Sequence, residues 1–328
     1  MDISIQDITA TIQKESAFLA DVRRQIDKAI VGQKRVVDKI LIAIFSDGHV
    51  LLEGVPGLAK TLMIKTIAAT LACSFKRIQF TPDLLPADVI GSTIYNPKTM
   101  EFSSKQGPIF HNIILGDEIN RAPAKVQSAL LEAMQEHQVT IGDTTYQLPK
   151  PFLVLATQNP IEQEGTYPLP EAQVDRFFMK ITVGYPTRTE EKQIMEGQTS
   201  LLTAQIEPVI QPADIARIQQ IIETIYVDEK LKEYILDIVA ATREPEKYKL
   251  PIKNLISNGC SPRASIALLK AAKAQAFLQG KGFVSPDDVK LVVMDVLRHR
   301  LMVSYEAEAE GLNSDLVIQK ILDGIIVP

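Results

Sequence analysis

The sequence has few cysteines, and this scarcity argues against two kinds of structural cross-link. Among 328 residues there are only two cysteines, Cys73 and Cys260, and neither belongs to a Cys-x-x-Cys pair or a His/Cys cluster. A disulfide framework and a zinc site of the usual spacing are therefore not expected. We interpret both as free thiols, buried or incidental.

An excess of basic residues and a long apolar run are also missing. The formal net charge is −5 and the pI is about 5.6, so the chain has no overall electrostatic attraction to nucleic acid or anionic membranes. No apolar run approaches the length of a membrane span, and residues 1–21 lack the uninterrupted apolar core of a signal peptide. The protein is therefore predicted to be cytoplasmic.

The remaining pattern divides the chain into two domains. Up to residue 186, short apolar runs alternate with helical spacing, which predicts an α/β domain with a parallel five-stranded sheet sandwiched by helices. From residue 187 onward only helical patterns remain, so residues 187–328 are predicted to form an all-helical lid domain. The expected strands lie at residues 49–53, 75–80, 111–115, 152–156 and 178–183, and the expected lid helices at 189–199, 212–225, 228–242, 262–279, 286–298 and 314–325.

Two segments interrupt the alternation of strands and helices. Residues 92–102 contain Asn96-Pro97 between β-prone runs, and residues 139–148 contain Gly142-Asp143 in a similar setting. Both patterns favour β-hairpins inserted into helical connections, with ordinary surface loops as the alternative.

A glycine-rich turn directly after the first strand carries the strongest chemical signal. Its position between a strand and a helix is the one that a P-loop requires, where backbone N–H groups surround phosphates and the helix N-terminus adds positive potential. Lys60 is expected to reach the β- and γ-phosphates of ATP, and the Thr61 hydroxyl to bind Mg²⁺. The predicted nucleotide-binding residues here are Gly54, Val55, Pro56, Gly57, Leu58, Ala59, Lys60, Thr61 and Leu62.

Ala59 departs from the usual P-loop pattern, which has glycine immediately before the lysine. Alanine is well tolerated in the first turn of a helix, provided that its backbone is right-handed.

Acidic and amide side chains follow two later strands. Asp117 and Glu118 end the third strand, where ligands bind in parallel sheets, so Asp117 is a candidate for holding Mg²⁺ and Glu118 for polarising the attacking water. Asn159 follows the fourth strand and could orient that water. Taken alone, the acid pair could simply face solvent, and Asn159-Pro160 could be an ordinary turn.

These motifs, in this order, resemble the MoxR family of AAA+ ATPases. The similar segments include residues 30–33, 54–61, 116–122, 130–136, 156–160, 170–177 and 261–264, and residues 305–311 also fit. The resemblance implies that Val31 and Gly32 line an adenine pocket and that Asn159 senses the γ-phosphate. It also implies that Arg176 is an arginine finger for the neighbouring subunit, and that Arg263 reaches the phosphates from the lid.

The resemblance further implies a homo-oligomeric ring, expected to be a hexamer, that remodels a protein substrate with a von Willebrand A domain partner. The two predicted hairpins would face the ring pore or the substrate. Physically, a guanidinium on the γ-phosphate offsets charge that develops in the transition state. If Arg263 holds the phosphates from the lid, loss of ATP should let the lid rotate about residues 184–190.

Other interpretations of the sequence stay open. Either arginine could form a surface ion pair instead, and Arg121 is a competing finger candidate because it follows the catalytic acids. A nucleic-acid-associated ring motor is the alternative function, although the acidic balance and the few basic residues in the hairpins, Lys98 and Lys105, disfavour it. A small-molecule kinase or GTPase is a further alternative, which the helical lid with Arg263 disfavours. A nucleotide-binding scaffold without turnover is another, which the intact Glu118 disfavours.

Overall fold

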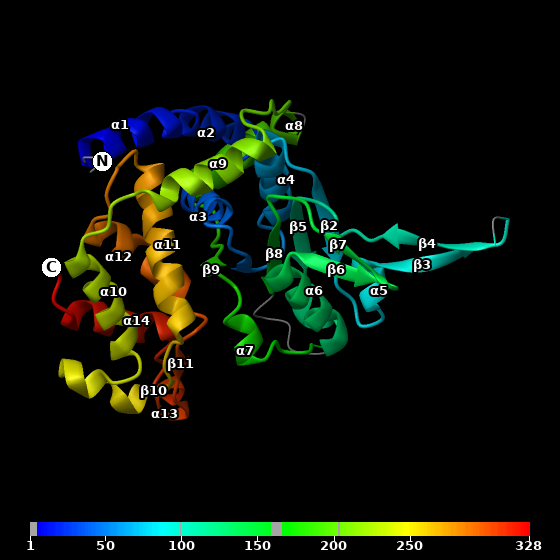
Figure 1. Ribbon diagram of the computed structural model, residues 1–328. Helices are drawn as coiled ribbons and strands as arrows, with labels where there is room; N and C mark the ends of the chain where they lie inside the picture. Colours follow the sequence, from blue (N-terminus) through cyan, green and yellow to red (C-terminus); the bar gives the residue numbers. More distant parts are fainter. Residues whose placement is uncertain (1–4, 99, 159–165, 203) are drawn as a thin grey trace.

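A five-stranded parallel sheet forms the centre of the first domain in the computed structural model, which describes residues 5–98, 100–158, 166–202 and 204–328 (Figure 1). The strand order is β2-β5-β8-β1-β9, and every neighbouring pair is parallel. The predicted α/β sheet is confirmed, because each strand overlaps one predicted run: β1 (Val50–Glu53), β2 (Phe75–Gln79), β5 (Ile113–Asp117), β8 (Leu153–Gln158) and β9 (Met179–Thr182).

Helices cover both faces of this sheet. In β1, Val50 and Leu52 pack into one cluster and Leu51 into the other, and all three are at most 1% exposed. This split follows from the two-residue period of a strand, and burial on both faces explains the continuous apolar sequence. The first face is covered by α2 (Leu19–Asp27), α3 (Lys34–Phe45) and α4 (Lys60–Thr70), and the second by α5 (Pro86–Ile90) and α6 (Ala124–Glu136).

Both predicted hairpins are present, so the surface-loop alternative is wrong for each. One consists of β3 (Gly91–Asn96) and β4 (Glu101–Gln106), and the other of β6 (Gln138–Ile141) and β7 (Thr144–Gln147). The β3–β4 hairpin projects away from the body of the domain (Figure 1).

The second domain contains the predicted helices and a short sheet that was not predicted. β10 (Ile256–Asn258) pairs with β11 (Met302–Val303), and strands this short show no alternation in sequence. The lid helices are α8 (Arg188–Leu202), α9 (Pro212–Glu223), α10 (Glu229–Ala241), α11 (Pro262–Leu278), α12 (Pro286–Leu297) and α14 (Ser314–Gly324). The shorter or N-terminal elements are α1 (Ile5–Ser16), α7 (Glu171–Val174), α13 (Tyr305–Ala309) and the 3-10 helices η1 (Ile119–Arg121), η2 (Pro245–Tyr248) and η3 (Lys253–Leu255).

The lid packs tightly on the first domain. α11 lies against α3, where the rings of Phe277 and Phe45 meet edge to face with centroids 5.8 Å apart, and α12 lies against the edge strand β9. One hydrophobic cluster runs through both domains. The boundary between residues 186 and 187, which lies in the connection from β9 to α8, therefore stays a prediction.

The backbone of Ala59 is left-handed, so the condition under which alanine is well tolerated there is not met. Its φ is 53° and its ψ is 23°, and α4 begins at the next residue. A left-handed L-residue costs roughly 1–2 kcal/mol because its Cβ crowds the following carbonyl oxygen. The P-loop therefore stores local strain at the residue before Lys60.

Ala59→Gly should raise the free energy of unfolding, by up to about 1 kcal/mol, because glycine adopts left-handed geometry without that crowding. The matched control is Ala69→Gly, an exposed position within α4, which should lower stability by about 1 kcal/mol. Chemical denaturation of the three proteins measures both effects. Equal destabilisation by the two substitutions would contradict the assigned strain.

Candidate active site

The P-loop leaves the carboxyl end of β1 and closes on itself through Lys60. The Lys60 ammonium donates a hydrogen bond to the Gly54 carbonyl at 2.7 Å. Glycine is required at position 54 because the backbone of Val183 approaches it closely, and a Cβ there would lie 2.7 Å from the Val183 carbonyl oxygen. Burial lowers the pKa of Lys60, while the charges of Asp117 and Glu118 oppose that shift. The lysine and the acid pair therefore share one electrostatic environment.

Asp117 is held by both neighbouring strands at the end of β5. Its Oδ1 accepts a hydrogen bond from the Thr157 hydroxyl of β8 at 2.6 Å, and its Oδ2 accepts one from the Arg77 guanidinium of β2 at 2.6 Å. With 18% of its side chain exposed, Asp117 does not simply face solvent. The strands on either side fix the carboxylate beside the P-loop.

Glu118 is restrained just as closely. Its backbone N–H donates to the Thr157 hydroxyl at 2.9 Å, and its carboxylate accepts from Gln79 Nε2 at 3.0 Å and pairs with Arg121 Nε at 3.1 Å. Gln79 and Arg77, both on β2, were missed by sequence reasoning. Their strand is a short run in which three of the five residues are polar, and only the strand order shows that β2 lies beside β5.

An apolar cavity of about 250 Å³ lies beside the P-loop. It is lined by Val31 and Leu62, together with Pro186 from the connection after β9 and Ile194 from α8. The role of Val31 and Leu62 in nucleotide binding stays a prediction. Gly32 does not line this cavity. A Cβ at Gly32 would lie 2.1 Å from Oε1 of Glu190, so this glycine instead makes room for the first turn of α8.

Arg176 lies at the opposite edge of the sheet from the P-loop. It lies three residues before the start of β9. The amino end of β9 adjoins the amino end of β1, because Phe178 N–H donates to the His49 carbonyl at 2.7 Å. Arg176 is exposed and lines a second cavity, of about 260 Å³. The role of Arg176 as an arginine finger for a neighbouring subunit stays a prediction.

Arg263 lies in the second cavity too, beside Arg176 and not beside the P-loop. Its guanidinium is 3.6 Å from the Asp175 carboxylate, and it is half exposed. In this structure Arg263 lies away from the P-loop of its own chain, and the interpretation that it reaches the phosphates from the lid stays a prediction. The sequence placed it correctly in the first turn of a lid helix, but could not show which sheet edge that helix meets.

Arg121 and Asn159 are the two remaining candidate residues. Arg121 lies on the P-loop edge, paired with Glu118 of its own chain. Asn159 falls outside the residues that the structure describes. Within the described ranges, no three His, Cys, Asp or Glu side chains gather in a metal-binding group, and no helix is long and apolar enough to cross a membrane.

The cavity beside the P-loop predicts a measurable contribution from Ile194 to nucleotide affinity. Ile194→Ala removes apolar contact area and should weaken binding of a fluorescent adenine nucleotide by up to about tenfold. Met195→Ala is the matched control, because Met195 is the next residue of α8, is 75% exposed and does not line the cavity. Equal affinities in the two variants would exclude this cavity as the base-binding site.

Comparisons with known proteins agree with the geometry. Residues 49–179 match the model of the ATPase family associated with various cellular activities (AAA), and residues 252–321 match the AAA lid domain. A crystal structure of a proposed ATPase from Cytophaga hutchinsonii superposes with a TM-score of 0.91 at 48% identity, covering 98% of both chains.

Two relatives carry a common family name. The Chaperone MoxR1 of Mycobacterium tuberculosis is 47% identical over 93% of this chain and 81% of its own length. Protein MoxR of Methylorubrum extorquens is 30% identical over 94% of this chain and 96% of its own. The P-loop, the acid pair, the lid and these relatives together show that the chain belongs to the MoxR family of AAA+ ATPases.

Proposed function

We propose that the chain hydrolyses ATP with Mg²⁺ in sites shared between neighbouring subunits, and uses this reaction to remodel a partner protein. One observation carries the proposal. The P-loop and the acid pair lie at one edge of the sheet, and Arg176 and Arg263 lie together at the other. A four-residue strand such as β1 spans about 13 Å, so these groups cannot meet within one chain.

Within one chain, the P-loop edge would bind and activate the nucleotide. Lys60 would exchange its hydrogen bond to the Gly54 carbonyl for bonds to the β- and γ-phosphate oxygens, where its positive charge would offset their negative charge. Glu118 would accept hydrogen bonding from the attacking water, which requires it to leave Gln79 and Arg121.

The residues present fit a magnesium ion bound together with the phosphates. Thr61, in the first turn of α4, and Asp117, at the end of β5, provide the hydroxyl and carboxylate oxygens that Mg²⁺ prefers. The ion would supply positive charge to the phosphate oxygens. Arg77 would release or share the Asp117 carboxylate when nucleotide and metal bind.

The opposite edge would complete the site of a neighbour. Arg176 and Arg263 both face outward beside one cavity, so a neighbouring P-loop edge docked there would place its γ-phosphate near two guanidinium groups. Such a head-to-tail contact uses different surfaces on each subunit and therefore repeats around a ring. The family resemblance favours a hexamer.

The remodelling role is supported by the relatives and by the β3–β4 hairpin. One relative is named a chaperone. The hairpin exposes Tyr95 and Phe102, whose ring centroids are 5.1 Å apart, together with Ile94 and Met100. Exposed apolar groups on a projecting element suit contact with a protein substrate. A von Willebrand A domain protein, implied by the resemblance, is the proposed adaptor.

Mixing two inactive variants tests the shared site. Arg176→Ala should lower ATP turnover by roughly 10³-fold, and Glu118→Gln should also abolish it, because each removes one half of every site. In a 1:1 mixture, about one interface in four joins an intact Glu118 to an intact Arg176, so turnover should recover toward a quarter of wild type. Steady-state ATPase assays at fixed total protein measure this recovery.

The control mixes Glu118→Gln with Lys60→Ala, two defects on the same side of the interface, and should stay inactive. If the Arg176→Ala mixture stays equally inactive, Arg176 does not act across an interface, and Arg121→Ala would be tested in its place. Strongly salt-dependent binding of DNA by the wild type would instead favour the nucleic-acid motor.

A further inference from the structure

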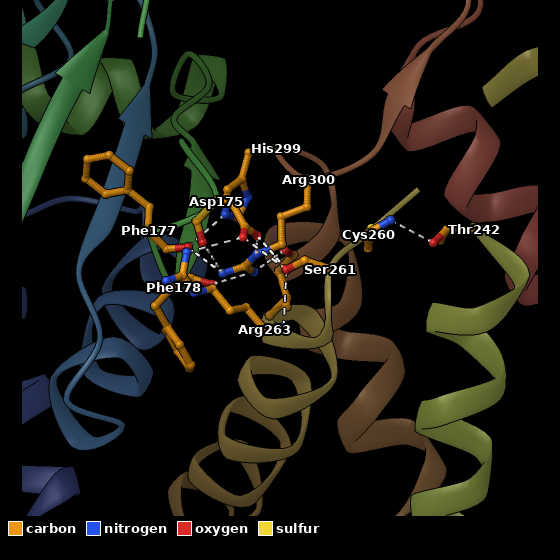
Figure 2. Close-up of polar contacts among 10 residues, drawn as sticks. Asp175, Phe177, Phe178, Thr242, Cys260, Ser261, Arg263, His299 and Arg300 are labelled. Atoms are coloured by element: carbon orange, nitrogen blue, oxygen red, sulfur yellow. Dashed lines mark hydrogen bonds and ion pairs between the residues drawn. The ribbon is translucent and has the colours of Figure 1, made fainter. Parts of the chain in front are cut away.

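Arg300 is buried where the lid meets the start of β9, and its guanidinium holds the chain on both sides of Arg176. Its Nε donates to Asp175 Oδ1 at 3.0 Å, and its terminal nitrogens donate to the carbonyls of Asp175, Phe177 and Phe178 at 3.3, 2.6 and 3.1 Å (Figure 2). Only 3% of the Arg300 side chain is exposed. The residue between these acceptors, Arg176, is exposed.

The neighbours of Arg300 strengthen the same contact. His299 Nε2 donates to the Phe177 carbonyl at 2.9 Å, and burial lowers the pKa of His299 well below its ordinary value, so the ring is a neutral donor. The Phe177 and Phe178 rings pack into the clusters on opposite faces of the sheet. The segment 175–178 is therefore anchored to the sheet by its side chains and to the lid by its backbone.

Asp175 extends this contact to the start of α11. Its carboxylate accepts a hydrogen bond from the Ser261 hydroxyl at 3.0 Å and lies 3.6 Å from the Arg263 guanidinium. Ser261 also caps α11, the helix whose first turn carries Arg263. The carboxylate of Asp175, which directly precedes Arg176, thus connects buried Arg300 with exposed Arg263, as the converging contacts in Figure 2 show.

Stability alone is a poor explanation for this arrangement. Desolvating a guanidinium is expensive, and well-packed apolar residues often stabilise a protein as much as a buried ion pair does. The fork of Arg300 instead fixes three carbonyls at defined positions, which a single point charge cannot do. Its specific effect is to fix the backbone direction from which Arg176 projects.

We propose that Arg300 is a positioning residue for ATP hydrolysis at the neighbouring subunit's site, because it holds Arg176, on the segment before β9, and Arg263, on the lid, in one fixed cationic face. This inference rests on the proposed shared site. It differs from a hinged lid, since the lid and the arginine-bearing segment move together.

The test replaces Arg300 by lysine, which keeps the charge but loses the fork. Arg300→Lys should lower kcat by about ten- to a hundredfold, because small misplacements of a catalytic group have costs of this size. The affinity for adenine nucleotide should not change, since the P-loop lies at the other edge. Mixing Arg300→Lys with Glu118→Gln should restore turnover, whereas mixing it with Arg176→Ala should not.

Lys281→Met is the matched control for damage to the lid. It removes a partner of the buried Asp288, an ion pair within the lid that does not contact residues 175–178. Its kcat per folded molecule should stay close to wild type even if its melting temperature falls. If Arg300→Lys does not fold by circular dichroism, Asp175→Asn is used, with the same rescue pattern expected.

The outcomes separate the inference from the function beneath it. If Arg176→Ala is rescued by Glu118→Gln but the Arg300→Lys or Asp175→Asn defect is not, the positioning role is wrong and the shared site stands. A kcat for Arg300→Lys equal to that of Lys281→Met also overturns it. If Arg176→Ala is not rescued either, the shared site fails and the inference fails with it.

Discussion

The parallel register of the five strands is the constraint on which this active site depends. Because all carboxyl ends share one edge, the loop after β1 and the acids after β5 lie together, and the charge of Lys60 is coupled to those of Asp117 and Glu118. The same register places the segment before β9 at the other edge. Arg176 and Arg263 are therefore separated from the phosphates of their own chain, and in the proposed function they serve a neighbour.

Each edge is held by contacts that differ in how easily they can change. At the P-loop edge, Glu118 bonds to Gln79 and Arg121, which are at least partly exposed, so nucleotide can compete for these contacts at modest cost. At the arginine edge, Arg300 is buried and its acceptors are backbone carbonyls. The nucleotide side can therefore rearrange while the arginine side stays rigid. The rotation about residues 184–190 stays a prediction, and the continuous core between the domains opposes it.

Local signals in the sequence were sufficient for most of the fold. The strand runs and the two hairpins each depend on residues close in the chain, and all are present. Contacts between distant segments were not predictable. Pro186 and Ile194 line a cavity together with P-loop residues that precede them in the sequence by more than a hundred residues. Arg300 likewise contacts a segment that precedes it by more than a hundred residues. The left-handed backbone of Ala59 was not predictable for another reason, because the loop imposes it against the conformational preference of alanine.

In the proposed function, one chain cannot complete its own active site. The most direct measurement is ATP turnover per chain across a dilution series of the wild type, with the assembly state followed in parallel by analytical ultracentrifugation. Turnover per chain should fall in step with the loss of assembled protein, while nucleotide stays bound to the dissociated subunits. Full turnover per chain from protein shown to be monomeric would contradict it.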